Sequence, residues 1–288
     1  MLIVMEVKSF VKELEKKKHK EKREYIKGVL MQYGISFKTQ HFVTIFGSGE
    51  NIFVDYSFTS DPKNERYIVL SAHYDTAFDF PGANDDASGV AVLLSLLIQF
   101  HTLKKRTHPI RFIFFDREER FPFLLGSKAY VKKYGVDAVK QMISLDSVGE
   151  GDNLLLWADE KKAQDLIKLI GNSSEKSHVK TYVVSPVIAF LPFHIGFSSD
   201  HLPFLAKGCV NSCCITMISK EDKKFGEKII IGKHFGDFLK SLLLYYAKRK
   251  SDLPLFLRHY HNKNDRVAFI EEEALKKAYA VLVDLIQK

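Results

Sequence analysis

Short apolar runs separated by polar turns recur along this 288-residue chain. Six of these runs have the length and composition of strands buried on both faces of a sheet: residues 67–70, 110–115, 141–145, 154–158, 182–190 and 212–218. Five other segments have apolar positions near helical spacing: residues 87–104, 126–134, 160–170, 235–248 and 271–287. Because strands and helices alternate without a dividing linker, the pattern predicts a single α/β domain over residues 1–288.

The first part of the chain carries two other patterns. Residues 7–33 have the spacing of one long helix that Gly34 ends, which predicts an N-terminal amphipathic helix within residues 1–34. Two further runs, 37–46 and 51–58, flank Gly47-Ser48-Gly49, and this combination predicts a β-hairpin that turns at the glycines.

Composition and charge exclude some classes of function. A hydrophobic content of 46% and a charged content of 27% are typical of a soluble globular protein. The formal net charge of +8 would suit a nucleic-acid partner. Half of this excess lies between Met5 and Lys27, without the interleaved aromatic residues of a single-strand binder. We therefore interpret the basic segment as a solvated helix face and expect no nucleic-acid partner.

The expected location of the chain is the cytoplasm. Cys209, Cys213 and Cys214 are the only cysteines, and their odd number and apolar neighbours predict buried thiols without a disulfide framework. The apolar start at residues 1–5 is too short for a secretory signal, and no apolar stretch is long enough to span a bilayer. A membrane partner is not expected.

Acidic and histidine side chains follow the predicted strands at the points where these end. These side chains are His73, Asp75, Asp85, Asp86, Glu118, Glu119 and Asp146. The carboxyl ends of strands in an α/β sheet form the edge where ligands bind. Clustered carboxylates repel one another, and a pair of divalent cations about 3.5–4 Å apart would remove that repulsion. Mixed nitrogen and oxygen ligands suit zinc, so the pattern predicts a two-metal hydrolytic site.

Short motifs of the same chemistry occur in a fixed order between about residues 67 and 265. They are His73-Tyr-Asp75, Gly82-Ala-Asn-Asp85-Asp86-Ala-Ser-Gly89, Phe115-Asp-Arg-Glu118-Glu119, Gly126-Ser127, Leu145-Asp146-Ser-Val-Gly149, Ser199-Asp200-His201-Leu-Pro203-Phe204 and Tyr260-His261. The series resembles metallopeptidase family twenty-eight, which includes di-zinc leucyl aminopeptidases, glutamate carboxypeptidase and glutaminyl cyclases. This resemblance implies a single-domain zinc-aminopeptidase-like fold, with a mixed central sheet and helices on both faces.

The resemblance also implies a ligand set for two Zn²⁺ ions, although other divalent metals are an alternative. Asp85 would bridge the two ions. His73 and Asp146 would complete one site, and Glu119 and His261 would complete the other. His261 departs from the family pattern, because Asn262-Lys263-Asn264-Asp265 follows it where the family usually has Thr-Pro-x-Asp.

Catalytic roles are implied for three more residues. Glu118 would be the general base, and Tyr260 would stabilise the oxyanion. Asp75 would orient the ring of His73, because a ligating histidine usually needs a partner on its other nitrogen. The bond between Asp85 and Asp86 is expected to be cis, as it often is in the family. Ser199 and Asp200 are interpreted as the start and cap of a short helix to residue 207.

Two segments depart from the family. Residues 120–123, Arg-Phe-Pro-Phe, intervene between the paired glutamates and Leu124-Leu125-Gly126-Ser127, and they are expected to reshape the substrate pocket. Residues 219–258 are interpreted as a lid or an oligomer-contact insertion.

The resulting hypothesis is a zinc-dependent exopeptidase, an aminopeptidase that hydrolyses the N-terminal residue of short peptides. Two alternatives remain at this point: a single-zinc glutaminyl cyclase of the same fold, and a catalytically silent binding module. The sequence leaves the preferred N-terminal residue, the physiological metal and the oligomeric state open.

Overall fold

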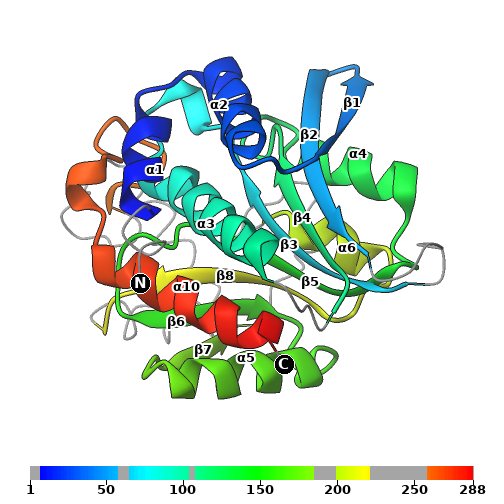
Figure 1. Cartoon of the computed structure of the whole chain (residues 1–288), viewed down its shortest axis with the longest axis vertical. Coiled ribbons are helices and arrows are strands. Elements are labelled where there is room, and N and C mark those ends of the chain that lie inside the picture. Colours follow the sequence, from blue (N-terminus) through cyan, green and yellow to red (C-terminus); the bar gives the residue numbers. More distant parts are fainter. Residues whose placement is uncertain (1–6, 58–64, 104–107, 185–198, 221–257, 288) are drawn as a thin grey trace, which may run out of the picture.

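A computed structural model describes residues 7–57, 65–103, 108–184, 199–220 and 258–287. Its centre is an eight-stranded sheet in the order β1-β2-β4-β3-β5-β8-β6-β7 (Figure 1). The strands are β1 (Lys38–Thr44), β2 (Gly47–Tyr56), β3 (Tyr67–His73), β4 (Ile110–Phe115), β5 (Val139–Leu145), β6 (Asn153–Ala158), β7 (Thr181–Val184) and β8 (Ser212–Ile218).

The middle of the sheet is parallel and its flanks are mixed. Strands β4, β3, β5 and β8 pair in parallel, so their carboxyl ends lie at one edge. Strand β2 pairs antiparallel with β1 and β4, and β6 pairs antiparallel with β8. The predicted mixed α/β sheet is therefore confirmed, and its parallel centre carries the side chains expected at the site.

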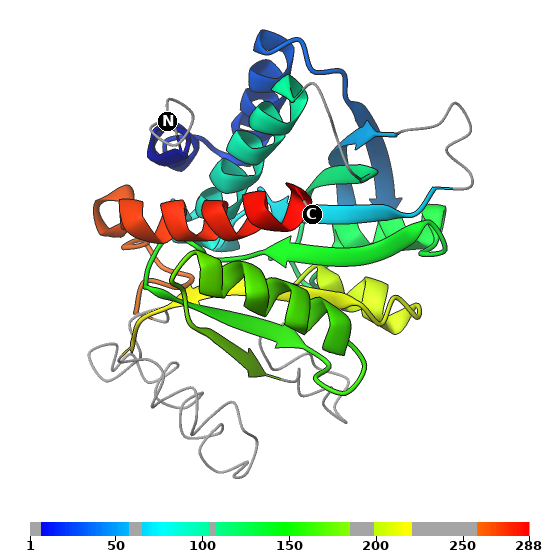
Figure 2. The same ribbon diagram turned by 60° about the horizontal axis from the view of Figure 1, so that its bottom comes forward.

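Helices cover both faces of the sheet. They are α1 (Val7–Glu15), α2 (His19–Gln32), α3 (Gly89–Thr102), α4 (Leu125–Tyr134), α5 (Gln164–Lys176), α6 (His201–Ala206) and α10 (Glu272–Gln287). Among the described residues there are also the short turns η3 (Ala77–Asp79), η4 (Ala83–Ser88) and η6 (Val267–Phe269). Helices α3 and α10 lie side by side over one face (Figures 1 and 2), while α4 and α6 pack on the other.

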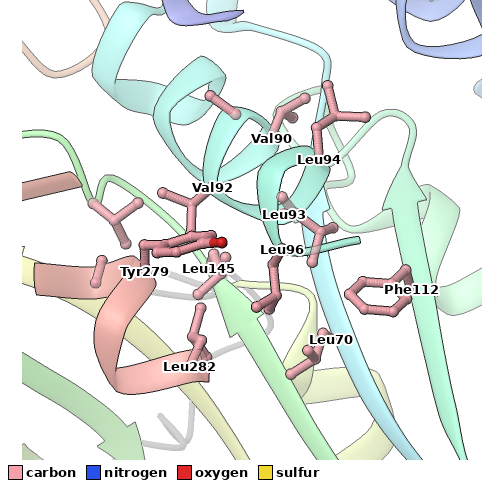
Figure 3. Close-up of a cluster of buried hydrophobic side chains, with 14 of the residues drawn as sticks. Leu70, Val90, Val92, Leu93, Leu94, Leu96, Phe112, Leu145, Tyr279 and Leu282 are labelled. Carbon is pink, nitrogen blue, oxygen red and sulfur yellow. The ribbon is translucent and has the colours of Figure 1, made fainter. Parts of the chain in front are cut away.

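Alternation along the central strands divides the apolar side chains between two cores. Leu70 and Phe112 point to the larger core, together with Leu93 and Leu96 of α3 and Leu282 of α10 (Figure 3). Their strand neighbours, such as Val69 and Ile113, point to the smaller core beneath α4 and α6. Successive strand side chains point to opposite faces, so a strand buried on both sides must be apolar throughout. The central strands satisfy this condition.

Two local predictions are corrected by the structure. The predicted helix over residues 7–33 is two helices, because Lys18 is extended and its N–H donates to the Glu21 carboxylate (2.8 Å), which starts α2 anew. The first hairpin does not turn at the glycines. Gly47, Ser48 and Gly49 belong to β2, and the turn consists of Ile45 and Phe46, which are exposed.

Other boundaries shift or fall outside the described residues. Helix α5 begins later than predicted and continues through Gly171 and Asn172 instead of stopping there. Most of residues 182–190 and 219–258, including the predicted helix over 235–248, lies outside the described part of the chain. Among the helices that are described, none is long and apolar enough to cross a membrane.

Candidate metal centre and active site

His73 is the last residue of β3 and is fully buried. Its ring Nδ1 lies 3.2 Å from the backbone carbonyl oxygen of Asp75. A carbonyl can only accept a hydrogen bond, so Nδ1 carries a hydrogen and Nε2 is the ring nitrogen left to face other groups. Nε2 lies 3.2 Å from Oδ1 of Asp85. The fold thus places a ring nitrogen and a carboxylate oxygen opposite each other, where a shared cation would contact both.

Asp85 lies between two histidines. It belongs to η4, which follows Gly82 with a φ of 60°, a left-handed value that glycine adopts readily. One carboxylate oxygen faces His73, and the other lies 3.2 Å from Nε2 of His261. The bond between Asp85 and Asp86 is cis, as expected. The two oxygens of Asp85 are therefore directed to different partners.

Candidate ligand atoms form three groups, each within 4.8 Å across, in the part of the chain that the structure describes. The groups are His73–Asp85–Asp146, Asp85–Glu119–His261 and His73–Glu118–Glu119. The first two share Asp85 and contain all five ligands that the resemblance implied. Glu119 also lies 2.8 Å from Nε2 of His261.

This set of donors fits divalent metal ions. Nε2 of His73 and Oδ1 of Asp85 are buried and have no hydrogen-bond partner, although they are near one another. Buried polar atoms are rarely left in this state, and a cation is a usual explanation. Imidazole and carboxylate donors in groups of three match the ligand chemistry of zinc.

The electrostatics of the group also favour a cation. Burial and the neighbouring Asp85 raise the pKa of Glu119 to about 8, and burial with Glu119 raises that of Glu118 well above its usual range. Burial lowers the pKa of His261, but Glu119 and Asp85 outweigh it and bring the value to about 10. These shifts are expected for a site with excess negative charge. The shared carboxylate of Asp85 differs, because burial would raise its pKa but His261 and His73 hold that pKa well below its usual range.

Asp75 makes contacts in addition to the one expected with His73. Its carboxylate oxygens accept the backbone N–H groups of Glu118 (2.9 Å) and Glu119 (3.1 Å). Oδ1 also lies 3.7 Å from Nδ1 of His73, and the backbone carbonyl oxygen of Asp75 lies 3.2 Å from the same nitrogen. The end of β3 brings this carboxylate directly beside the end of β4 because the strands are parallel neighbours. Asp75 therefore links His73 to the paired glutamates.

Tyr260 and His261 approach the group from a loop late in the chain. Their rings are stacked, with centroids 3.7 Å apart and an angle of 19° between planes. Burial and the charge of Glu119 raise the pKa of Tyr260 well above its usual range, so its hydroxyl remains a hydrogen-bond donor. The structure thus brings together all eight residues that were expected at the site.

Three residues that received no role from the sequence support the site. Asp86 accepts the backbone N–H groups of His73, Gly89 and Ser147. Asp265 accepts those of Asn84 (2.6 Å) and Asp85 (3.0 Å), and Asn84 in turn accepts that of Gly149 (2.7 Å). The run of small polar residues in the Gly82–Gly89 motif was the available signal for Asn84 and Asp86.

Asp200 was misinterpreted as a helix cap. Its side chain makes no capping hydrogen bond to α6. It is fully buried, burial raises its pKa to about 7, and its charge contributes to the raised pKa of Glu118. The side chain therefore belongs to the electrostatic surroundings of the site.

The model of one family, described as peptidase family M28, matches residues 51–286. The chain belongs to peptidase family M28. Among curated M28-like relatives, aminopeptidase YwaD of Bacillus subtilis is 32% identical over 155 residues, which are 51% of this chain and 32% of that protein. Glutaminyl-peptide cyclotransferase of Drosophila melanogaster is 34% identical over 112 residues, which are 33% of this chain and 32% of that protein. The matched part thus spans about a third of these two relatives.

Solved structures support the M28 fold over nearly the whole chain. A glutaminyl cyclase of Bacteroides thetaiotaomicron has a TM-score of 0.72 at 20% identity, covering 99% of this chain and 97% of its own. A Zn-dependent exopeptidase from Parabacteroides distasonis has a TM-score of 0.71 at 17% identity, covering 99% and 98%. The zinc-exopeptidase fold is therefore shared with proteins of two different activities.

Proposed function

We propose that this M28 chain is a metal-dependent aminopeptidase that removes the N-terminal residue of short peptides. The observation that carries the proposal is Asp85, whose two oxygens belong to two separate groups of three ligands. A pair of neighbouring cation sites with a shared carboxylate is the arrangement used for two-metal hydrolysis. The similarity to aminopeptidase YwaD over half of the chain supports the same activity.

The five donors divide into two zinc sites. His73 and Asp146 would hold one ion and Glu119 and His261 the other, with Asp85 as the shared ligand. When bound, the ions would supply Lewis-acid polarisation of the scissile carbonyl and of the attacking water.

Proton transfer falls to Glu118. This carboxylate is buried beside the ligands and its backbone is fixed by Asp75. It would accept a proton from the water as the oxygen attacks the scissile carbonyl carbon, and return that proton to the peptide nitrogen as the carbon–nitrogen bond breaks. The hydroxyl of Tyr260 would donate a hydrogen bond to the carbonyl oxygen as negative charge develops there. The acids of the site would hold the free amino group of the substrate.

Glu118→Gln tests the role of the base. The variant keeps the shape of the side chain but cannot accept the proton, so hydrolysis of a panel of aminoacyl-anilides should fall about 10²–10⁴-fold. Metal content, measured on the same samples, should be unchanged. Glu175→Gln, at an exposed position of α5, is the matched control and should retain full activity. Undiminished hydrolysis by the Glu118 variant would contradict the proposal.

A glutaminyl cyclase is the second candidate, because the Drosophila relative of that name is 34% identical over 112 residues. Metal stoichiometry and products separate the two activities. We expect about two zinc ions per chain and release of the first amino acid. A single tightly bound zinc, with ring closure of peptides that begin with glutamine, would establish the cyclase instead.

We also propose that the activity is cytoplasmic and directed at peptides. Cys209, Cys213 and Cys214 are buried free thiols, as expected from the sequence. Such thiols suit a reducing compartment.

A further inference from the structure

Three phenylalanines are exposed on the loops next to the proposed base. Phe46, Phe78 and Phe121 expose 48%, 84% and 64% of their surface, and we call them the aromatic rim. Large aromatic side chains are usually buried or placed where a ligand covers them. We therefore expect a ligand or a partner to cover the aromatic rim.

The rim residues come from three segments, and contacts join the Phe121 segment to each of the other two. The ring of Phe46 contacts that of Phe121 edge to face, with centroids 5.9 Å apart. Asp79, next to Phe78, pairs with Arg120, next to Phe121, at 3.2 Å. At the base of the same loops, Asp75 accepts the backbone N–H of Glu118. Glu118, the proposed general base, thus lies where the Phe78 loop and the Phe121 loop join.

The loop that carries Phe121 is held by its own hydrogen bonds. The N–H of Phe123 donates to the carbonyl of Arg120 (2.7 Å), and Lys128 Nζ donates to the carbonyls of Pro122 (3.2 Å) and Phe123 (2.9 Å). These bonds fix the backbone on both sides of Phe121. Its exposure is therefore a property of the folded loop.

The backbone at the rim is strained. Phe78 has a φ of 53° and Phe123 a φ of 61°, and both values lie in the left-handed region that bulky residues rarely adopt. Such conformations cost free energy and concentrate at active sites and ligand clamps. This backbone strain is an observation independent of the side-chain exposure, and it also indicates that the rim binds a ligand.

We propose that the aromatic rim binds the side chain of the peptide residue that follows the scissile bond, and so selects substrates with an apolar residue there. This inference rests on the proposed aminopeptidase function. Glu118 returns its proton to the leaving nitrogen, which is the backbone nitrogen of that residue. The residue must therefore begin beside Glu118, where the rim loops join, and aromatic faces favour apolar partners.

Dipeptide amides test this selection, because they share leucine at the first position and differ at the second. The wild-type kcat/KM for Leu-Phe-amide should exceed that for Leu-Ser-amide by about 10-fold or more. In the double variant Phe78→Ser/Phe121→Ser this ratio should fall to about 1–2. Met31→Ser, which removes an exposed apolar side chain at the end of α2, is the control and should keep the wild-type ratio.

The possible outcomes separate the two proposals. If the wild type cleaves both amides and the double variant keeps the full ratio, the rim does not select the substrate and this inference is overturned alone. If the wild type releases leucine from neither amide, the aminopeptidase function fails and the inference fails with it. An unchanged ratio together with loss of a dimer in sedimentation, or loss of binding to phosphatidylserine vesicles, would assign the rim to a second copy or to a membrane.

Discussion

Asp75 illustrates how single residues at this site act through the backbone. Its carboxylate accepts two consecutive N–H groups, those of Glu118 and Glu119, and these lie at the end of a different strand. Its pKa is lowered: burial opposes the charged form, but the contact with His73 and the backbone donor at Glu118 outweigh burial. An ionised carboxylate therefore sets the position of both the proposed base and a proposed ligand.

We predict that Asp75→Asn destabilises the protein even when no metal is bound. The amide would place an NH₂ group against one of the two backbone N–H groups, and an unsatisfied buried donor costs about 1–3 kcal/mol. The measurement is urea unfolding in the presence of a chelator. Asp137→Asn, at an exposed position, is the control.

The chelator makes this a test between two roles. If Asp75 served only to orient His73 for metal binding, the metal-free variant would unfold at the same urea concentration as the wild type. The contacts with Glu118 and Glu119 lead us to expect a lower midpoint.

At the scale of elements, α3 connects the candidate site to the core. It begins at Gly89, directly after η4, and nearly all of its side chains are buried between β3 and α10 (Figure 3). The N–H of Gly89 donates to Asp86, so the first turn of the helix is tied to the site. The apolar helix is thus the support on which η4 and Asp85 are placed.

Leu96→Ala should therefore lower the free energy of unfolding by about 2–5 kcal/mol, because it leaves a cavity in a packed core. Leu96 is fully buried in the larger core. Lys168→Ala on the exposed side of α5 should change stability by less than about 0.5 kcal/mol. If the two substitutions had equal effects in thermal or urea unfolding, the packing of α3 in the larger core would not contribute to stability as described.

Elements with a strong apolar pattern could be predicted from the sequence, and those set by polar contacts could not. Strands β4 and β8 have the predicted bounds because they are continuous apolar runs. The break between α1 and α2 depends on a hydrogen bond from Lys18 to Glu21, which helical spacing does not reveal. The turn at Ile45 and Phe46 was missed for a similar reason, since Gly47-Ser48-Gly49 is the stronger turn signal but lies within β2.

Site residues at the ends of strands could be predicted from the sequence, whereas those on a loop late in the chain were harder to predict. Residues 73, 118, 119 and 146 follow buried strands, so their meeting at one edge follows from parallel pairing. His261 and Tyr260 come from a loop without a periodic pattern, and only the family resemblance indicated them. Asp86 lies in the Gly82–Gly89 motif and Asp265 at the acidic position after His261, but these patterns do not reveal the backbone contacts through which the two residues act.

At the scale of the molecule, the sheet gathers acidic groups at one buried edge. Burial and neighbouring carboxylates raise the pKa values of Glu118, Glu119 and Asp146. A ligand that binds only the folded state stabilises it by about 4 kcal/mol at a thousandfold excess over its Kd. Bound metal should therefore contribute to global stability as well as to chemistry.

We predict that removal of metal by a chelator lowers the melting temperature by about 5–15 °C and that zinc restores it. Asp85→Asn, which removes the shared ligand, should melt low and respond weakly to zinc. Identical melting temperatures of the wild type with and without chelator would contradict the proposal that metal stabilises this edge of the sheet.

The proposed ligands are widely spaced along the chain, from His73 to His261. During translation at about 5–20 residues/s, tens of seconds separate the emergence of these two histidines from the ribosome. Until His261 emerges, the nascent chain lacks one ligand of the Asp85–Glu119–His261 group. The proposed site is therefore completed only after His261 has emerged, when most of the chain has already been synthesised.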